Sequence, residues 1–208
     1  MKTMFVGATI KNEPDYDFLV KEISKLPWKK FAICYSNQFG LVADKLSKLI
    51  DDKVTQKIQV LGCSNPRFKE ETEAILIIGQ GKFHAVSLAY ESKLPTYVLE
   101  WDKIWKVTNE EILKMEQKEK GALKKYLMSD EIGILITTKP GQMRFKQALE
   151  FHKSLHEKKS YLFIANDINV NEFENFGIKS WVNTACPRMD LDKGFILNLD
   201  KIPKDLIK

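Results

Sequence analysis

The apolar run AILII, residues 74–78, contains no polar side chain and is followed directly by a glycine. Such a run is typical of a strand buried on both faces, as in a parallel sheet covered by helices on each side. FAICY at 31–35 and TYVL at 96–99 predict further strands, with helical spacing of apolar residues in the segments between. Strands that alternate with helices predict an α/β fold with mostly parallel sheets.

The second half of the chain repeats this pattern. A charged helix is predicted near residues 109–127, followed by strands and helices in alternation. The expected strands are 132–137, 161–165 and 181–185, and the expected helices are 145–156 and 170–176. We therefore predict two similar α/β domains, residues 1–107 and 108–208, each with a mostly parallel sheet and flanking helices.

The composition is that of an ordinary globular protein, with 208 residues, 44% hydrophobic and 29% charged. No apolar stretch approaches about 18 residues, and the first residues lack the apolar core of a signal peptide. We expect a cytoplasmic protein with no membrane partner. The net charge of +5 is compatible with nucleic acid or an acidic protein partner. A lysine-rich solvated surface explains it better, so no nucleic-acid partner is expected.

Three cysteines, Cys34, Cys63 and Cys186, carry most of the candidate chemistry. An odd number of distant cysteines argues against a disulfide framework in the cytoplasm. Cys63 and Cys186 are 123 positions apart (186 − 63), so no local zinc or ferredoxin spacing applies. Taken alone, a cysteine at a strand end is more often a small buried hydrophobe than a ligand.

The residues around the cysteines favour a ligand role. Pro187 cannot donate a ladder hydrogen bond, so the strand before it should stop and leave Cys186 at its carboxyl edge. Ligands bind at that edge in open α/β sheets. Cys34, at the end of its own predicted strand, would lie on such an edge as well. Three thiolates could hold a [4Fe-4S] cluster with one iron open, and Cys34 is the tentative third.

The segment GQGKFH, residues 79–84, is similar to a phosphate-cradling turn at a helix start. Its two glycines do not make a dinucleotide fingerprint, so ligand contact and a simple tight turn both stay open. His152 and His156 have a spacing that metal ligands use, but no acid stands between them as in a metalloprotease helix. They are predicted to be surface residues.

Four stretches together resemble one family. They are VLGC (60–63), IIGQGKFH (77–84), TKPGQ (138–142) and WVNTACPR (181–188). In this order they resemble the diphthamide-biosynthesis 2-(3-amino-3-carboxypropyl)histidine synthase family, radical S-adenosylmethionine enzymes of archaea and eukaryotes. The resemblance extends from near residue 1 to about residue 195.

The resemblance implies a function and its cofactors. Family members have three similar α/β domains, each giving one cysteine to a central [4Fe-4S] cluster. They bind S-adenosylmethionine, cleave it reductively and transfer a 3-amino-3-carboxypropyl group to a histidine of elongation factor 2. By motif, Cys63 matches the middle-domain ligand and Cys186 the last-domain ligand. The ligand site is expected to include, beside these cysteines, Gly79, Gly81, His84, Gln142 and Arg188. Arg188 would pair with a carboxylate, and a structural ion pair is its alternative.

The chain resembles only the middle and last domains, so a third cluster ligand must be sought. Cys34 could replace it, a separate homologous subunit could supply it, or the chain could be a non-catalytic paralogue. The expected partners are elongation factor 2 or another protein or small-molecule acceptor. A homodimer or a complex with a homologous subunit is also expected.

Overall fold

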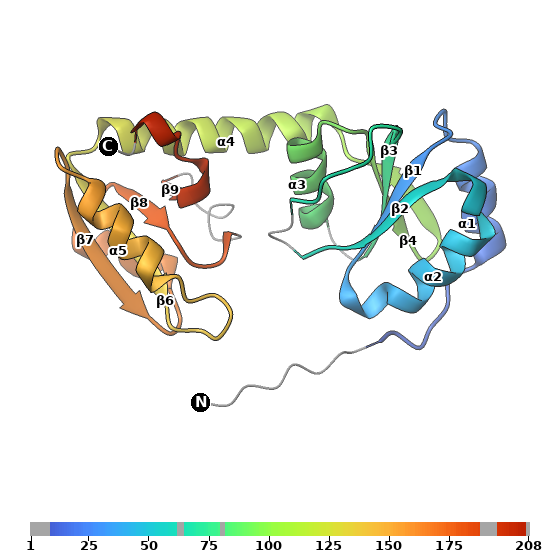
Figure 1. Cartoon of the computed structure of the whole chain (residues 1–208), viewed down its shortest axis with the longest axis horizontal. Coiled ribbons are helices and arrows are strands. Elements are labelled where there is room, and N and C mark those ends of the chain that lie inside the picture. Colours follow the sequence, from blue (N-terminus) through green and yellow to red (C-terminus); the bar gives the residue numbers. More distant parts are fainter. Residues whose placement is uncertain (1–8, 62–64, 80–81, 188–194, 207–208) are drawn as a thin grey trace. The chain divides into compact units, whose positions relative to one another are not determined.

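The computed structural model describes residues 9–61, 65–79, 82–187 and 195–206 (Figure 1). The chain divides into two compact units, Met1–Met115 and Glu116–Lys208. The division falls within a helix, α4 (Asn109–Met128), whereas the predicted boundary precedes that helix. No helix in the described part of the chain is both long enough and apolar enough to cross a membrane.

The first unit is a five-stranded sheet with helices on both faces. Its elements, beside the 3-10 turns η1 (Asn37–Phe39) and η2 (Asp51–Lys53), are α1 (Tyr16–Ser24), β1 (Phe31–Tyr35), α2 (Gly40–Leu49), β2 (Val54–Gln59), β3 (Ala74–Ile78), α3 (Lys82–Ser92), β4 (Thr96–Glu100) and β5 (Lys103–Lys106). The strand order is β2-β1-β3-β4-β5, and only the β4–β5 pair is antiparallel. Asp15 begins α1, since its Oδ1 accepts a hydrogen bond of 3.0 Å from the backbone N–H of Phe18.

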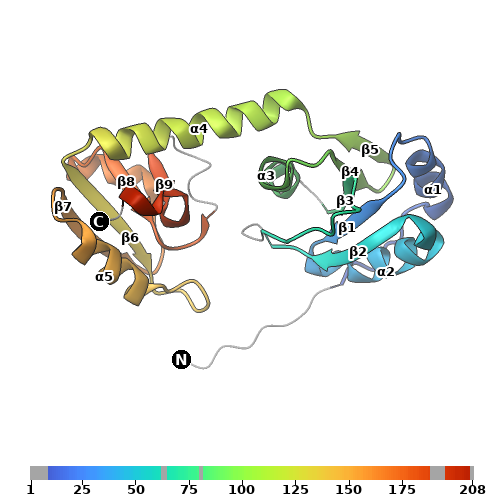
Figure 2. The same ribbon diagram turned by 45° about the horizontal axis from the view of Figure 1, so that its top comes forward.

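Two apolar layers hold this sheet. On one face, α1 and α2 pack against alternate strand residues such as Ile33, Leu76 and Leu99. On the other face, α3 packs against the intervening residues, among them Ile75 and Ile77. Figure 2 shows α3 on one side of the sheet and α1 and α2 on the other. All five residues of β3 are buried, which confirms the prediction of a strand covered on both faces.

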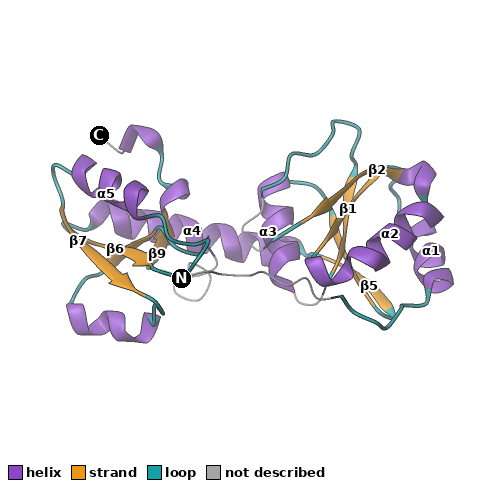
Figure 3. Ribbon diagram, turned by 60° about the horizontal axis from the view of Figure 1, so that its bottom comes forward, coloured by secondary structure: helices purple, strands orange, loops and turns teal. Residues whose placement is uncertain are grey.

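The second unit has a four-stranded sheet in which every pair is parallel. Its elements after α4 are β6 (Glu131–Thr137), α5 (Phe145–Ser154), β7 (Lys159–Ala165), η3 (Val170–Phe176), β8 (Ser180–Asn183), β9 (Ile196–Asn198), η5 (Leu199–Lys201) and η6 (Lys204–Leu206). The strand order is β7-β6-β8-β9. Helical segments lie on both faces of this sheet (Figure 3). The predicted α/β class with two mostly parallel sheets is therefore confirmed.

Glycine makes room for one aromatic layer of the second sheet. The indole of Trp181, on β8, packs against Phe173 with ring centroids 4.2 Å apart. A Cβ atom added to Gly133 on β6 would lie only 2.3 Å from that indole. Because Cβ atoms essentially never approach another atom so closely, any larger residue opposite Trp181 would force the indole or β6 to shift.

Several predicted strand limits were wrong. The apolar residues in 58–61 predict a strand there, but β2 begins at Val54, four residues earlier, because this outer strand carries alternating polar residues. β8 ends at Asn183, two residues before the predicted end. Two strands were not predicted: β5, which is short and partly exposed, and β9, which has three residues. The run MFVGAT, residues 4–9, also predicts a strand, and it lies almost wholly outside the described residues.

Candidate functional site

The carboxyl edge of the first sheet has a crevice position between β1 and β3. The chain leaves β1 for β2 on one side and later returns to β3 on the other side of β1, so the strand order reverses there. Ser36 and Gly79 follow these two strands, and the backbone N–H of Ser36 donates to the Ile78 carbonyl at 3.4 Å. A Cβ on Gly79 would lie 3.8 Å from the Ser36 Oγ. Gly79 therefore lies at the edge where ligands bind in this class of sheet.

Cys34 does not lie at that edge. It is the fourth of the five residues of β1, and its side chain is 0% exposed. It packs in the apolar layer beneath α3 with Ile75, Ile77 and Leu88. Burial raises the pKa of the thiol from its ordinary value to about 12. The expectation of an edge position was wrong, and the neutral buried thiol disfavours the tentative role of Cys34 as a third ligand.

The carboxyl edge of the second sheet repeats the crevice arrangement. Here the strand order reverses between β6 and β8, and the turn 138–142 follows β6. Within that turn, the N–H of Gln142 donates to the Lys139 carbonyl at 3.1 Å, and Gly141 has φ +78°. Proline followed by a glycine at positive φ is the pattern of a type II turn. The TKPGQ stretch is thus a rigid turn that leaves the side chain of Gln142 exposed.

Cys186 lies in the loop after β8, on the other side of the same crevice position. It is three residues beyond Asn183, where the strand ends, and it is partly exposed. Thr184 ties this loop to β6, since its N–H and its Oγ1 both donate to the Leu135 carbonyl, at 3.1 and 2.7 Å. Cys186 therefore follows a strand at the carboxyl edge, and Gln142 follows the neighbouring strand.

The buried side-chain amides of Asn183 and Asn198 also hydrogen-bond to the Cys186 loop. Asn183 Nδ2 donates to the Cys186 carbonyl at 2.7 Å, and its Oδ1 accepts from the N–H of Ala185 at 2.9 Å. The same Nδ2 donates to Asn198 Oδ1 at 2.7 Å, and Asn198 Nδ2 donates to the Pro187 carbonyl at 2.9 Å. Both amides are almost fully buried, 3% and 5% exposed. The backbone around Cys186 is thus fixed at consecutive positions.

The remaining predicted residues are placed as follows. His84 is the third residue of α3 and is partly exposed. His152 lies on α5 and shares a hydrogen bond of 2.7 Å with Ser160 Oγ, and His156 lies beyond the end of that helix. Cys63, Gly81 and Arg188 lie outside the described residues. Among the residues that the structure does describe, no group of three His, Cys, Asp or Glu is placed to hold a metal ion.

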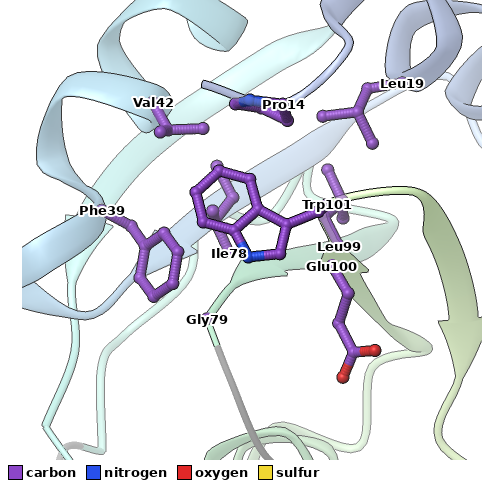
Figure 4. A pocket seen from close by; sticks show the side chains of 9 residues that line it. All are labelled: Pro14, Leu19, Phe39, Val42, Ile78, Gly79, Leu99, Glu100 and Trp101. Atoms are coloured by element: carbon purple, nitrogen blue, oxygen red, sulfur yellow. The ribbon is translucent and has the colours of Figure 1, made fainter. Parts of the chain in front are cut away.

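A small hollow in the first unit lies near the carboxyl ends of β3 and β4. Figure 4 shows Trp101 at its centre with Phe39, Ile78 and Pro14 around it, and the carboxylate of Glu100 pointing away. The Phe39 and Trp101 rings are 6.0 Å apart at an angle of 52°. The space is about 20 Å³, enough for one water-sized group. This hollow does not accommodate a substrate in the described state.

A larger hollow of about 720 Å³ lies in the second unit. Its walls include Phe173, Trp181 and Phe195, and lysines at its rim include Lys124 and Lys179. No sequence prediction pointed to it. Its aromatic walls come from residues that serve the apolar layer of Trp181, so the sequence signal for the hollow is the same as that for the core.

Comparison with known proteins assigns the chain to a family. Residues 1–195 match the family model described as "Putative diphthamide synthesis protein". The chain belongs to this diphthamide synthesis family. The resemblance of the four sequence stretches is therefore confirmed.

Curated members of the diphthamide synthesis family are similar over different shares of the chain. The 2-(3-amino-3-carboxypropyl)histidine synthase of Pyrococcus horikoshii is 30% identical over 145 residues, 68% of this chain and 42% of that protein. The synthase of the same name from Methanocaldococcus jannaschii is 28% identical over 207 residues, 92% of this chain and 57% of that protein. The chain thus spans about half the length of these relatives.

The fold also matches solved structures of the family. The crystal structure of Dph2 from Pyrococcus horikoshii with a 4Fe-4S cluster has a TM-score of 0.75 and 24% identity. The match covers 89% of this chain and 59% of that one. A second structure of the same protein gives the same TM-score. At this identity the likeness establishes the fold. The residue roles rest on the positions described above.

Sequence reasoning missed one residue that hydrogen-bonds to the Cys186 loop. Asn198 lies on β9, beyond residue 195 where the family match ends. No motif marks it, and it belongs to a strand too short to predict from periodicity. A signal is nonetheless present, because an asparagine that ends the short apolar pair Ile196-Leu197 is unusual at a buried position. Only the pairing of β8 with β9 brings it to Pro187.

Proposed function

We propose that this chain is a [4Fe-4S] protein that binds and reductively cleaves S-adenosylmethionine. It would transfer a 3-amino-3-carboxypropyl group, as in the synthesis of diphthamide on elongation factor 2. The relatives named 2-(3-amino-3-carboxypropyl)histidine synthase support the reaction class. The observation that carries the proposal is the placement of Cys186, within the family match, in a loop at the carboxyl edge of its sheet.

The chemistry of the Cys186 site fits a cluster ligand. A ligand cysteine must reach the metal as a thiolate, so it should be accessible and held in place. Cys186 is partly exposed and lies in a loop tied to β6 by Thr184 and to β9 by Asn183. Cys63 is the second proposed ligand, on the motif VLGC. Cys34 fits poorly, because a thiol with a pKa of about 12 stays neutral in the core.

The other residues proposed for the site would bind and orient the substrate. A [4Fe-4S] cluster, when bound, supplies the electron for reductive cleavage of a carbon–sulfur bond. Gly79 and Gly81 allow a close approach of the backbone, and His84 is the third residue of the following helix. Gln142 offers an exposed amide on a rigid turn. Arg188 would pair with the substrate carboxylate, since its planar fork suits that group.

The proposal leaves the identity of the third cluster ligand open. Cys34 is one candidate, although its burial argues against it. A homologous subunit could instead supply a cysteine, either in a homodimer or in a mixed complex. The acceptor is proposed to be elongation factor 2, with another protein or a small molecule as the alternative, and the setting is the cytoplasm.

A second function, from a different class, is a non-catalytic paralogue or partner subunit that binds a catalytic homologue or elongation factor 2. The burial of Cys34 favours it, because two ligand cysteines alone do not complete a site of three. The two functions differ in one observable. If the chain is the catalytic protein, it binds iron through its own cysteines, with or without cysteines of a second copy. If the chain is a non-catalytic partner subunit, it binds no iron on its own.

Iron content after anaerobic reconstitution tests the proposal. The full chain should turn brown and hold about four iron and about four sulfide per cluster. The variant Cys186→Ala should hold almost none. Cys34→Ala is the matched control, since it removes a thiol from the core, and it should keep the iron of the unaltered chain. A colourless, iron-free protein would overturn the enzyme proposal and leave the non-catalytic partner subunit as the proposed function.

If iron binds, incubation with S-adenosylmethionine and dithionite identifies the reaction. The expected product is one that retains the aminocarboxypropyl carbons, with methylthioadenosine as the other fragment. Release of methionine and deoxyadenosine would instead mean that a different carbon–sulfur bond is cleaved. Loss of iron in Cys34→Ala, with the fold retained, would make Cys34 the third ligand.

A further inference from the structure

The two sheets allow a position-by-position comparison of the pairs formed by their third and fourth strands. In the first unit, Ile77 of β3 is paired with Val98 of β4. In the second unit, Asn183 of β8 is paired with Asn198 of β9. Ile77 and Asn183 are each the fourth residue of the third strand of their unit. The same place in the sheet is therefore apolar in one unit and doubly polar in the other.

The fold itself does not require amides at this place. Ile77 and Val98 are 3% and 1% exposed and belong to the apolar layer under α3. Burying an amide costs free energy unless its hydrogen bonds are made, whereas two apolar groups of similar size carry no such cost. The second unit must therefore make hydrogen bonds to these amides inside its core, a requirement that the first unit does not have. A local purpose in the second unit explains the difference.

Four described hydrogen bonds connect the two amides to each other and to one loop. Asn183 reaches the carbonyl of Cys186 and the N–H of Ala185, and Asn198 reaches the carbonyl of Pro187. The bond between the two side chains, 2.7 Å, joins these contacts into one network. The orientation of Asn183 is fixed by its partners, because reversing its amide would place Oδ1 against two acceptor oxygens.

We propose that Asn183 and Asn198 are positioning residues for Cys186, the residue that the proposed function makes a cluster ligand. They act through the backbone: the amide pair holds the carbonyls of Cys186 and Pro187, and with them the direction of the Cys186 side chain. Residues that orient a metal ligand by hydrogen bonds, without contacting the metal themselves, change metal affinity by about 10- to 100-fold when they are removed. The inference rests on the proposed function only for what the thiol binds.

The first unit supplies the design of the decisive variant. The double change Asn183→Ile with Asn198→Val installs the apolar pair that the first unit carries at the same place. Replacing both partners of the Asn183–Asn198 bond by apolar groups of similar shape is close to neutral for stability, while the N–H of Ala185 and the carbonyls of Cys186 and Pro187 lose their partners in the loop. The second unit should therefore stay folded and lose only the hold on the loop. Leu197→Ala is the control, since Leu197 is 1% exposed, neighbours Asn198 and packs in the layer under α5.

The first readout is the reactivity of Cys186 in the metal-free full chain. The thiols are alkylated anaerobically with iodoacetamide, and each cysteine is followed separately by mass spectrometry. We expect Cys186 of the double variant to react about tenfold faster than in the unaltered chain, because its loop opens more often. Leu197→Ala should react at the rate of the unaltered chain. A rate in the double variant that equals or falls below that of the control overturns the inference.

The second readout is the cluster after reconstitution. The double variant should lose iron to a chelator about tenfold faster than the unaltered chain, and the electron paramagnetic resonance signal of its reduced cluster should be shifted or broadened. Leu197→Ala should keep both properties. A double variant that retains iron and signal like the control overturns the inference and leaves the proposed function intact. An unaltered chain without iron overturns the proposed function, and alkylation of Cys186 then decides the inference alone.

If the double variant fails to fold, Asn198→Asp serves in its place. The aspartate keeps the size of the side chain and an oxygen that accepts from Asn183. It removes the N–H that Asn198 donates to the Pro187 carbonyl. Faster alkylation of Cys186 than in Leu197→Ala supports the inference, and an equal rate overturns it.

Discussion

The two units share the order of their first four strands and place their cysteines differently within it. In each, the first strand is central, the second strand lies outside it and the third and fourth follow on the other side. Cys63 comes after the second strand of its unit, and Cys186 comes after the third. Cys34 lies inside the first strand, opposite Ile77. A shared sheet plan therefore does not decide which strand end carries a ligand.

Register explains why Cys34 behaves as a core residue. Cys34 is paired with the fourth residue of β3, and Leu135 is paired with the fourth residue of β8. Leu135 is 1% exposed and packs beside Trp181. Cys34 thus occupies the place where the second unit has a buried leucine. A thiol there serves as a small hydrophobe, whereas a thiol in the loop after a strand is available for chemistry.

The largest expected effect separates these two thiols. With a pKa of about 12, roughly one Cys34 thiol in ten thousand is a thiolate at about pH 8. The side chain is also closed to reagents. In the folded, metal-free chain Cys34 should be alkylated about 1,000-fold more slowly than Cys186. Mass spectrometry of each cysteine measures this. Equal rates before unfolding would contradict the buried position, and in denaturant the two rates should converge.

The second prediction concerns alkaline pH. The unfolded chain ionises Cys34 near the ordinary pKa, and the folded chain only near 12. The stabilisation is therefore fully present below the ordinary pKa and is lost as pH rises through about 12. The full stabilisation is about 4 kcal/mol, because the pKa of Cys34 rises by about three pH units and each unit corresponds to about 1.4 kcal/mol. Urea unfolding over this range should show a smaller fall in Cys34→Val than in the unaltered chain.

The control for this prediction is Cys186→Ser. Because Cys186 lies in a partly exposed loop, its replacement should leave the alkaline fall of the unaltered chain in place. Identical pH profiles for Cys34→Val and the unaltered chain would mean that Cys34 ionises equally in the folded and unfolded states. That result would remove the physical contrast between the two units.

The third prediction concerns the residues that face the third strand. In the first unit Ala32 is paired with Ile75, and in the second Gly133 is paired with Trp181. A methyl group is accepted beside isoleucine, but at Gly133 it would lie 2.3 Å from the indole. Gly133→Ala should lower the free energy of unfolding by about 2–3 kcal/mol, through overpacking. Thermal unfolding followed by tryptophan fluorescence measures this, and an unchanged midpoint would show that Trp181 can move away without cost.

The sequence predicted the sheets well where a strand is central. The run 74–78 matches β3 in both limits, because a strand buried on two faces must be apolar throughout. The outer strands of the first sheet were predicted poorly: β2 alternates polar residues and β5 is short and partly exposed. Their identity depends on hydrogen bonds to a neighbour, and a single segment does not reveal these. Strand pairing is a tertiary property.

The candidate site shows the same limit. The motif around Cys186 could be recognised from sequence, and the turn at Gly141 could be predicted from its proline and glycine. The position of Cys34 was mistaken because one residue separates it from the strand end, and burial changes completely over that distance. Asn198 could not be found, since it acts across a parallel strand pair 15 residues from Asn183. These positions follow from register, which local patterns leave undetermined.

The smallest expected effect has the opposite sign to that at Gly133. Gly121 lies within α4, and a Cβ added there would meet nothing within 4 Å. Alanine lowers the conformational entropy of the unfolded chain and costs nothing in the helix, so Gly121→Ala should raise the free energy of unfolding by about 0.5–1 kcal/mol. Urea unfolding of this variant beside Gly133→Ala measures the pair. The same methyl group would then destabilise a strand that faces an indole and stabilise an exposed helix. If Gly121→Ala is destabilising, the open space over α4 is occupied in solution.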